Sequence, residues 1–193
     1  MVEVAQLSSP TLFLARAPAE GLIILRLRAD DQAGHMAAAQ ALGAPLPPTP
    51  CRPSETAALQ IYWTAPNAWL IATRSGGVAA VSARLRESLA NQDAAVVEAS
   101  DARTIFRISG AAARRLLAKG TGVDLHPRTF KAGDVALTRF AGLSVLLHQV
   151  SDEPAFVLYA ERPAGHYLWT WLTDAAHEFG VTANHEESAG TSG

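Results

Sequence analysis

The sequence lacks several features that would by themselves point to a function. Cysteine occurs once, at Cys51, among 193 residues, which excludes an intramolecular disulfide and a cysteine-rich metal cluster. With 18 acidic and 16 basic side chains, no charge excess predicts binding to nucleic acid or to an anionic membrane. No apolar run approaches the roughly 18 residues of a membrane span. The first residues show no basic region before an apolar core. We therefore expect a cytoplasmic protein without a secretory signal.

The motifs of several enzyme classes are missing as well. The sequence contains no Gly-x-Gly-x-x-Gly turn for a dinucleotide, no glycine-rich phosphate loop and no Gly-x-Ser-x-Gly nucleophile elbow. None of the six histidines pairs with another at a spacing of four, and His-Glu-x-x-His does not occur. We expect no catalytic, cofactor-binding or metal-binding residues on this chain.

Charge is scarce for a soluble domain, and two explanations stay open. Charged residues make up 18% of the chain and hydrophobic ones 49%, against about 25% charged in a typical domain. The mean hydropathy is +0.10. Either another chain covers part of the surface, or the many alanines raise both values without creating apolar patches.

The first half of the chain, residues 1–100, reads as an α+β unit. The apolar periodicity predicts a strand at 21–28, a helix at 33–42 that Asp30 or Asp31 caps and Gly43 ends, a hairpin at 58–63 and 68–73, a helix at 78–89 and a strand at 94–99. This β-α-β-β-α-β order is that of the ferredoxin-like split fold. The proline-rich stretch 45–53 is incompatible with a helix or a central strand. It is a connector or a recognition segment.

The second half, residues 101–180, repeats the pattern with an altered strand arrangement. We predict a strand at 104–108, a helix at 111–119 that Ser109-Gly110 caps, a hairpin at 135–140 and 143–150, a strand at 156–159, and a last helix from Pro163 to about residue 179, ended by Gly180. The tail, 181–193, is polar and predicted to be disordered. The junction near Ser100 has no linker composition, so we expect one fused unit.

Five segments resemble a known family. In one-letter code they are VEASDARTIFRISG at 97–110, AAARRLLAKG at 111–120, VDLHPR at 123–128, WTAPNAWL at 63–70 and YLWTWL at 167–172. Together they resemble the gamma subunit of heterotetrameric sarcosine oxidase, over roughly residues 63–180. The strand-Ser-Gly-helix block is also similar to the folate-binding fold of the glycine-cleavage aminomethyltransferase.

The resemblance implies an accessory, non-catalytic subunit that packs against larger flavoprotein subunits. The complex of that family oxidatively demethylates sarcosine to glycine and formaldehyde and forms hydrogen peroxide. It carries FAD, NAD and FMN, and tetrahydrofolate can accept the one-carbon unit. The resemblance places these cofactors on the larger subunits. The same subunit role in a complex that acts on another secondary N-methyl amine remains open.

Four residues are candidates for a subunit interface. Tyr167 and Trp169 lie off the core stripe of the last helix, which we expect to consist of Leu168, Trp171 or Leu172, Ala175 and Phe179. Large aromatics outside a core are favoured interface anchors, although partial burial against a neighbouring loop is the alternative. His126 and Arg128, with Asp124, form a polar cluster at a subunit contact, or else His126 bonds backbone carbonyls of its own loop.

A free-standing folate-binding one-carbon transferase or folate sensor is the main alternative function. A folate site needs a carboxylate for the pterin and aromatic walls. Asp101, Trp63 and Trp69 are the set that the sequence offers. Asp101 then polarises a small amine or the folate ring; otherwise it closes a turn or pairs with Arg103.

Overall fold

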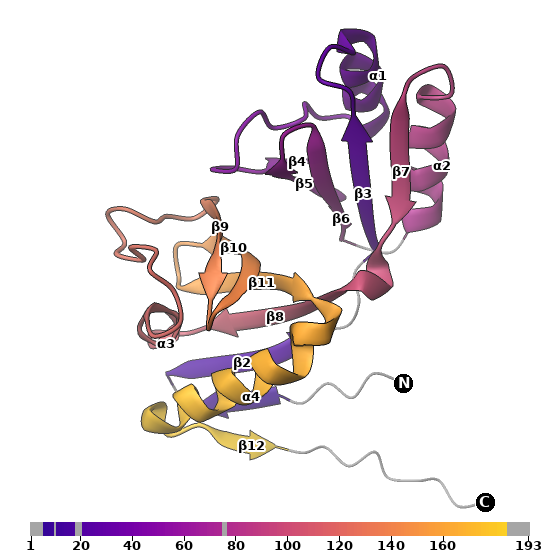
Figure 1. The fold of residues 1–193 in the computed structure, drawn as a ribbon. Helices are drawn as coiled ribbons and strands as arrows, with labels where there is room; N and C mark the ends of the chain where they lie inside the picture. The colour runs from indigo at the N-terminus through magenta and orange to yellow at the C-terminus, as the bar shows by residue number, and fades with distance from the viewer. Residues whose placement is uncertain (1–5, 10, 18–20, 75–76, 185–193) are drawn as a thin grey trace, which may run out of the picture. The chain divides into compact units, whose positions relative to one another are not determined.

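The computed structural model describes residues 6–9, 11–17, 21–74 and 77–184 (Figure 1). The chain divides into two compact units. One contains residues 1–18, 104–132 and 138–193, and the other contains residues 19–103 and 133–137. We call them the seven-strand unit and the five-strand unit after their sheets.

The five-strand unit is an α+β layer of helices on one sheet. Along the chain it runs β3 (Gly21–Leu27), α1 (Gln32–Leu42), β4 (Ser54–Glu55), β5 (Leu59–Ala65), β6 (Ala68–Thr73), α2 (Val78–Ser88) and β7 (Ala94–Glu98). The sheet order is β4-β5-β6-β3-β7, with antiparallel pairs throughout. Apart from the short β4, this is the predicted β-α-β-β-α-β order.

Local sequence signals fix the ends of these elements. The Asp31 carboxylate accepts a hydrogen bond from the Gly34 N–H at 2.8 Å and so caps α1. Gly43 ends the helix in the left-handed conformation, at a φ of 71°. The β5–β6 turn places Asn67 at a φ of 59°, a conformation that asparagine tolerates. All three predictions are confirmed.

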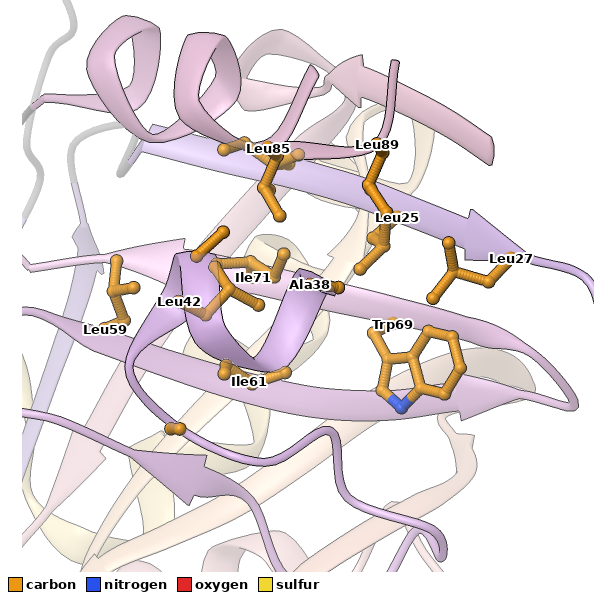
Figure 2. Packing of buried hydrophobic residues seen from close by; sticks show 13 residues of the cluster. Leu25, Leu27, Ala38, Leu42, Leu59, Ile61, Trp69, Ile71, Leu85 and Leu89 are labelled. Carbon is orange, nitrogen blue, oxygen red and sulfur yellow. The ribbon is translucent and has the colours of Figure 1, made fainter. Parts of the chain in front are cut away.

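The core of the five-strand unit lies between the sheet and its two helices (Figure 2). This core includes Leu25 of β3, Ile71 of β6 and Leu85 of α2, and each of these side chains is fully buried. Because alternate residues of a strand point to opposite faces, the odd-numbered residues of β3, β5 and β6 line the helix side. They are Ile23, Leu25, Leu27, Leu59, Ile61, Trp69 and Ile71.

The seven-strand unit has a longer sheet with two helices. Its elements are β1 (Gln6–Ser9), β2 (Leu12–Ala17), β8 (Arg103–Ser109), α3 (Ala113–Ala118), β9 (Val135–Phe140), β10 (Leu143–Ser151), β11 (Ala155–Glu161), α4 (Gly165–Ala176) and β12 (Thr182–Asn184), with 3₁₀ turns at Arg162–Ala164 and His177–Phe179. A further 3₁₀ turn, Ser100–Ala102, precedes β8 and belongs to the five-strand unit. The sheet order is β12-β1-β2-β8-β11-β10-β9. Strand β11 therefore lies between β8 and β10, whereas the sequence analysis predicted an altered arrangement without a strand order.

Helix α4 packs through aromatic contacts as well as its aliphatic stripe. Trp169 stacks on Phe106 of β8, with ring centroids 6.2 Å apart, and Trp171 meets Phe140 of β9 edge-on at 4.9 Å. The buried stripe is Gly165, Leu168, Leu172 and Ala176. Ala176 therefore takes the place that the sequence reading gave to Ala175, and Trp171 is half-buried.

Three expectations for this unit need correction. Strands β1 and β2 were not predicted, and β2 pairs with β8. The first strands therefore belong with the second half, and the boundary at residue 100 does not separate the sheets. In the stretch expected to be a disordered tail, β12 pairs with β1; residues 185–193 lie outside the described part.

The cap of α3 also differs from the prediction. Ser109 belongs to β8, and α3 begins at Ala113 without a side-chain cap. Gly110 instead adopts a φ of 104°, and a Cβ there would lie 2.6 Å from the Thr11 carbonyl oxygen. Glycine is thus required for backbone conformation and close approach.

Candidate functional site

The loop between α3 and β9 carries His126 and Arg128, and a single arginine fastens it. The Arg114 guanidinium, on α3, donates hydrogen bonds to the carbonyl oxygens of Leu125 and Phe130, the latter at 3.1 Å. It also donates to Oε1 of Gln149 at 3.0 Å. Gln149 is fully buried on β10. Burial lowers the pKa of Arg114, while Asp152 opposes this. The side chain thus supplies donors to a loop without regular secondary structure.

The loop's own polar groups form a tight turn. The His126 N–H donates to Oδ1 of Asp124 at 2.9 Å, and the Arg128 N–H donates to Nδ1 of His126 at 3.2 Å. The hydrogen bond from the His126 N–H, followed by one from the Thr129 side chain, lowers the pKa of Asp124. The structure therefore brings Asp124, His126 and Arg128 together as the sequence suggested. Nδ1 of His126 accepts from a backbone N–H, and bonding of the ring to carbonyls stays a prediction.

Beside this turn lies an open hollow of about 390 Å³ between α3 and the loop. Arg115 and Asp124 supply opposite charges to its wall, while most of the exposed lining is apolar. The lining residues are Arg114, Arg115, Ala118, Thr121, Gly122, Val123, Asp124, Leu125, His126 and Pro127. Its shape suits contact with another surface better than enclosure of a small ligand.

The two aromatic candidates on α4 have different environments. Tyr167 is 51% exposed, and its hydroxyl donates to the Ala141 carbonyl at 3.1 Å. Trp169 is half-buried because its ring stacks on Phe106. Tyr167 therefore offers an accessible ring, whereas much of Trp169 is already used to pack the helix.

The three residues of the folate hypothesis do not converge. Trp63 and Trp69 are register partners on β5 and β6, on the helix side of the sheet. Trp69 is buried, and its Nε1 donates to the Pro47 carbonyl at 2.9 Å. Asp101 lies beyond the end of β7, while Trp69 aligns through Leu25 with Val96. Asp101 therefore follows, by five residues and outside the strand, the position that aligns with Trp69.

Within the described ranges, His, Cys, Asp and Glu do not cluster in threes as a metal site would need. The helices of the described part are too short or too polar to cross a membrane.

The comparisons with known proteins assign the family. The model of the sarcosine oxidase, gamma subunit family matches residues 26–178. This chain belongs to that family. A sarcosine oxidase subunit gamma from Arthrobacter sp. is 32% identical over 187 residues, which cover 89% of this chain and 90% of the relative.

Solved structures agree with the gamma-subunit assignment. A chain of the heterotetrameric sarcosine oxidase from Corynebacterium sp. U-96, in complex with pyrrole 2-carboxylate, superposes with a TM-score of 0.82 at 26% identity. The match covers 93% of this chain and 90% of that one. The glycine cleavage system aminomethyltransferase T from Bartonella henselae matches with a TM-score of 0.58 at 15% identity, over 81% of this chain and 44% of that one. The second match shows a shared fold, and the predicted α+β class is confirmed.

The sequence analysis missed the two residues, Arg114 and Gln149, that anchor the loop between α3 and β9. Arg114 lies inside the block that carries the family resemblance, but a basic residue in a helix is usually solvated. Gln149 was read only as part of a strand. The available signal was that the alternation of the strand predicts burial at position 149, where a polar side chain needs a hydrogen-bond partner.

Proposed function

We propose that this chain is the accessory, non-catalytic gamma subunit of a heterotetrameric oxidase. The complex converts sarcosine, oxygen and water into glycine, formaldehyde and hydrogen peroxide. The observation that carries the proposal is the superposition on a chain of heterotetrameric sarcosine oxidase along nearly the full length of both chains. The low charge of the sequence supports a surface that is partly covered by other subunits.

The cofactors of the complex, FAD, NAD, FMN and tetrahydrofolate, are proposed to bind the larger flavoprotein subunits, in the cytoplasm. The absence of a dinucleotide turn from the sequence supports this placement. So does the position of Trp69, which is buried in the core of the five-strand unit with its Nε1 bonded to the Pro47 carbonyl.

The decisive experiment is to tag this chain in its native host and purify it under mild conditions. We expect flavin-containing larger subunits in the eluate, and peroxide formation that depends on sarcosine. The isolated chain should carry no visible flavin absorbance and turn over nothing. A monomer that oxidises sarcosine or transfers a one-carbon unit unaided would overturn the proposal. Peroxide formation with N-methylglutamate but not with sarcosine would show that the proposed substrate is wrong.

The proposed interface consists of Tyr167, Trp169, His126 and Arg128, of which Tyr167 is the best-supported anchor. An exposed aromatic ring with a fixed hydroxyl loses little conformational entropy on binding. Tyr167→Ala should reduce recovery of the larger subunits, whereas Tyr167→Phe, which keeps the ring, should retain them. Arg128→Ala is the corresponding test on the loop, because it keeps the hydrogen bond that the backbone N–H of Arg128 donates to His126. Full recovery with both alanine variants would exclude this interface.

A further inference from the structure

Strand β7 forms one edge of the five-stranded sheet, and among the described strands only β3 pairs with it. The Ala99 N–H donates to the Leu22 carbonyl at 2.7 Å, in register with the antiparallel β3–β7 pair. In such a pair, residues alternate between bonding to the partner strand and pointing away from it. Counting back from Ala99, the outward-pointing backbone groups belong to Ala94, Val96 and Glu98.

This edge has the composition of a strand that accepts another strand. Its sequence from Ala94 to Val97 is Ala-Ala-Val-Val, and Val97 is 52% exposed. Although the strand ends at the charged Glu98, an apolar, β-branched stretch on a sheet edge is a template for pairing with a further chain. A second copy of this chain fits it by symmetry. About a two-fold axis at Val96, each Val96 N–H faces the other copy's Val96 carbonyl, and Ala94 faces Glu98.

One side chain already forms a hydrogen bond with the backbone carbonyl at the centre of that pairing. Arg86, on α2, donates from its Nη2 to the Val96 carbonyl oxygen at 3.3 Å. Its Nη1 lies 3.6 Å from Oε1 of Glu98. Helix α2 packs beside β7, so the guanidinium reaches the edge from the strand's own unit. It places a positive charge and a bulky planar group where a second strand would lie.

We propose that Arg86 is an edge guard that keeps β7 from pairing with a second copy of this chain. The Val96 carbonyl already accepts a hydrogen bond from Arg86 of the same chain, and Glu98 pairs with the guanidinium and keeps it at the edge. This inference is independent of the proposed role in an oxidase complex, because it rests only on the geometry of the five-strand unit.

The test compares two arginines of the same helix in the purified full-length chain. Arg84 lies two residues from Arg86 and is exposed. Sedimentation over a concentration series should show that Arg86→Ala dimerises at least about tenfold more tightly than the parent chain. Arg84→Ala should match the parent. Glu98→Gln, which keeps the bond to Val96, should lie between them. If Arg86→Ala does not fold, Arg86→Met keeps the apolar stem and is used instead.

A second change shows whether β7 is the surface that pairs. Proline at position 96 removes an N–H that points away from β3, so the ladder within the sheet is retained. Adding Val96→Pro to Arg86→Ala should return the chain to a monomer. The proposal is wrong if the Arg86 variants associate no more than Arg84→Ala does. It is equally wrong if the dimer survives Val96→Pro.

Discussion

In the five-strand unit, mostly aliphatic side chains, with Trp69 among them, fill the space between the sheet and its helices, whereas the seven-strand unit adds an arginine and several ring pairs that each contain a phenylalanine. There Phe106, Phe140 and Phe156 each contact another ring, and Arg114 lies over Phe156, 5.5 Å from its centroid. Apolar burial is non-directional, so it suffices for regular elements. The long loop after α3 has backbone carbonyls that need donors. A directional side chain supplies them.

The largest expected effect comes from opening the aliphatic core. Ile71 is fully buried on β6, and Ile71→Ala should lower the free energy of unfolding by about 3 kcal/mol through lost burial and a residual cavity. Urea unfolding measures this change. Met36→Ala on α1, where the parent side chain is 69% exposed, should change stability by less than about 0.5 kcal/mol. Equal effects of the two substitutions would contradict this core.

Removing the arginine should affect the loop more than the sheet. Arg114→Met leaves the carbonyls of Leu125 and Phe130 and the Gln149 amide oxygen without their donor, at a cost of about 2 kcal/mol. Hydrogen exchange should speed up at the amide of Phe130, which donates to the His126 carbonyl.

The control for this change is the next residue along α3. Arg115 lies over Phe179, 5.1 Å from the ring centroid, and Arg115→Met should cost less than about 1 kcal/mol. Arg114→Lys should not restore the loop, because one ammonium group cannot span three fixed acceptors. A lysine variant as stable as the parent would rule out the fastening role of Arg114.

A buried hydroxyl group in the five-strand unit is a site where a substitution should stabilise the fold. Ser82 on α2 is fully buried, and its Oγ has no hydrogen-bond partner among the residues that the structure describes. Ser82→Ala should raise the free energy of unfolding by about 1 kcal/mol, since an unsatisfied polar group leaves the core. Ser88→Ala, at an exposed position of the same helix, gains only helix propensity, below about 0.5 kcal/mol. If both serine variants gain equally, burial of the hydroxyl carries no cost.

The difference between the units also explains how far the sequence could predict the fold. In the five-strand unit the signals are local: Asp31 caps α1, Gly43 ends it and Asn67 turns the hairpin. Every helix and long strand there was found. In the seven-strand unit the missed features depend on pairing between distant segments. Strand β2 is defined by β8, far along the chain, and β12 by β1.

The candidate site shows the same division. One of the two sequence interpretations of His126 grouped it with Asp124 and Arg128, and near neighbours such as these can meet within one turn. The anchoring of that cluster depends on Gln149, 35 positions after Arg114, and no local pattern encodes such a contact. The family resemblance gave the role of the chain, while these residues alone gave only a binding or structural module.

The smallest expected effect lies at the surface of this loop and appears only in acid. The pKa of Asp124 is lowered first by the His126 N–H and then by the Thr129 side chain. A carboxylate with a lowered folded-state pKa stabilises the fold above its unfolded pKa of about 4. That contribution is lost as the pH falls through the folded pKa.

Asp124→Asn should therefore flatten the loss of stability below about pH 4, measured as the urea midpoint against pH. Asp174→Asn, an exposed aspartate on α4, controls for the removal of one negative charge. If the profiles of the Asp124 and Asp174 variants differ, the hydrogen bonds to the Asp124 carboxylate cause the difference. Identical acid profiles would mean that the hydrogen bonds to Asp124 position the turn without coupling its stability to pH.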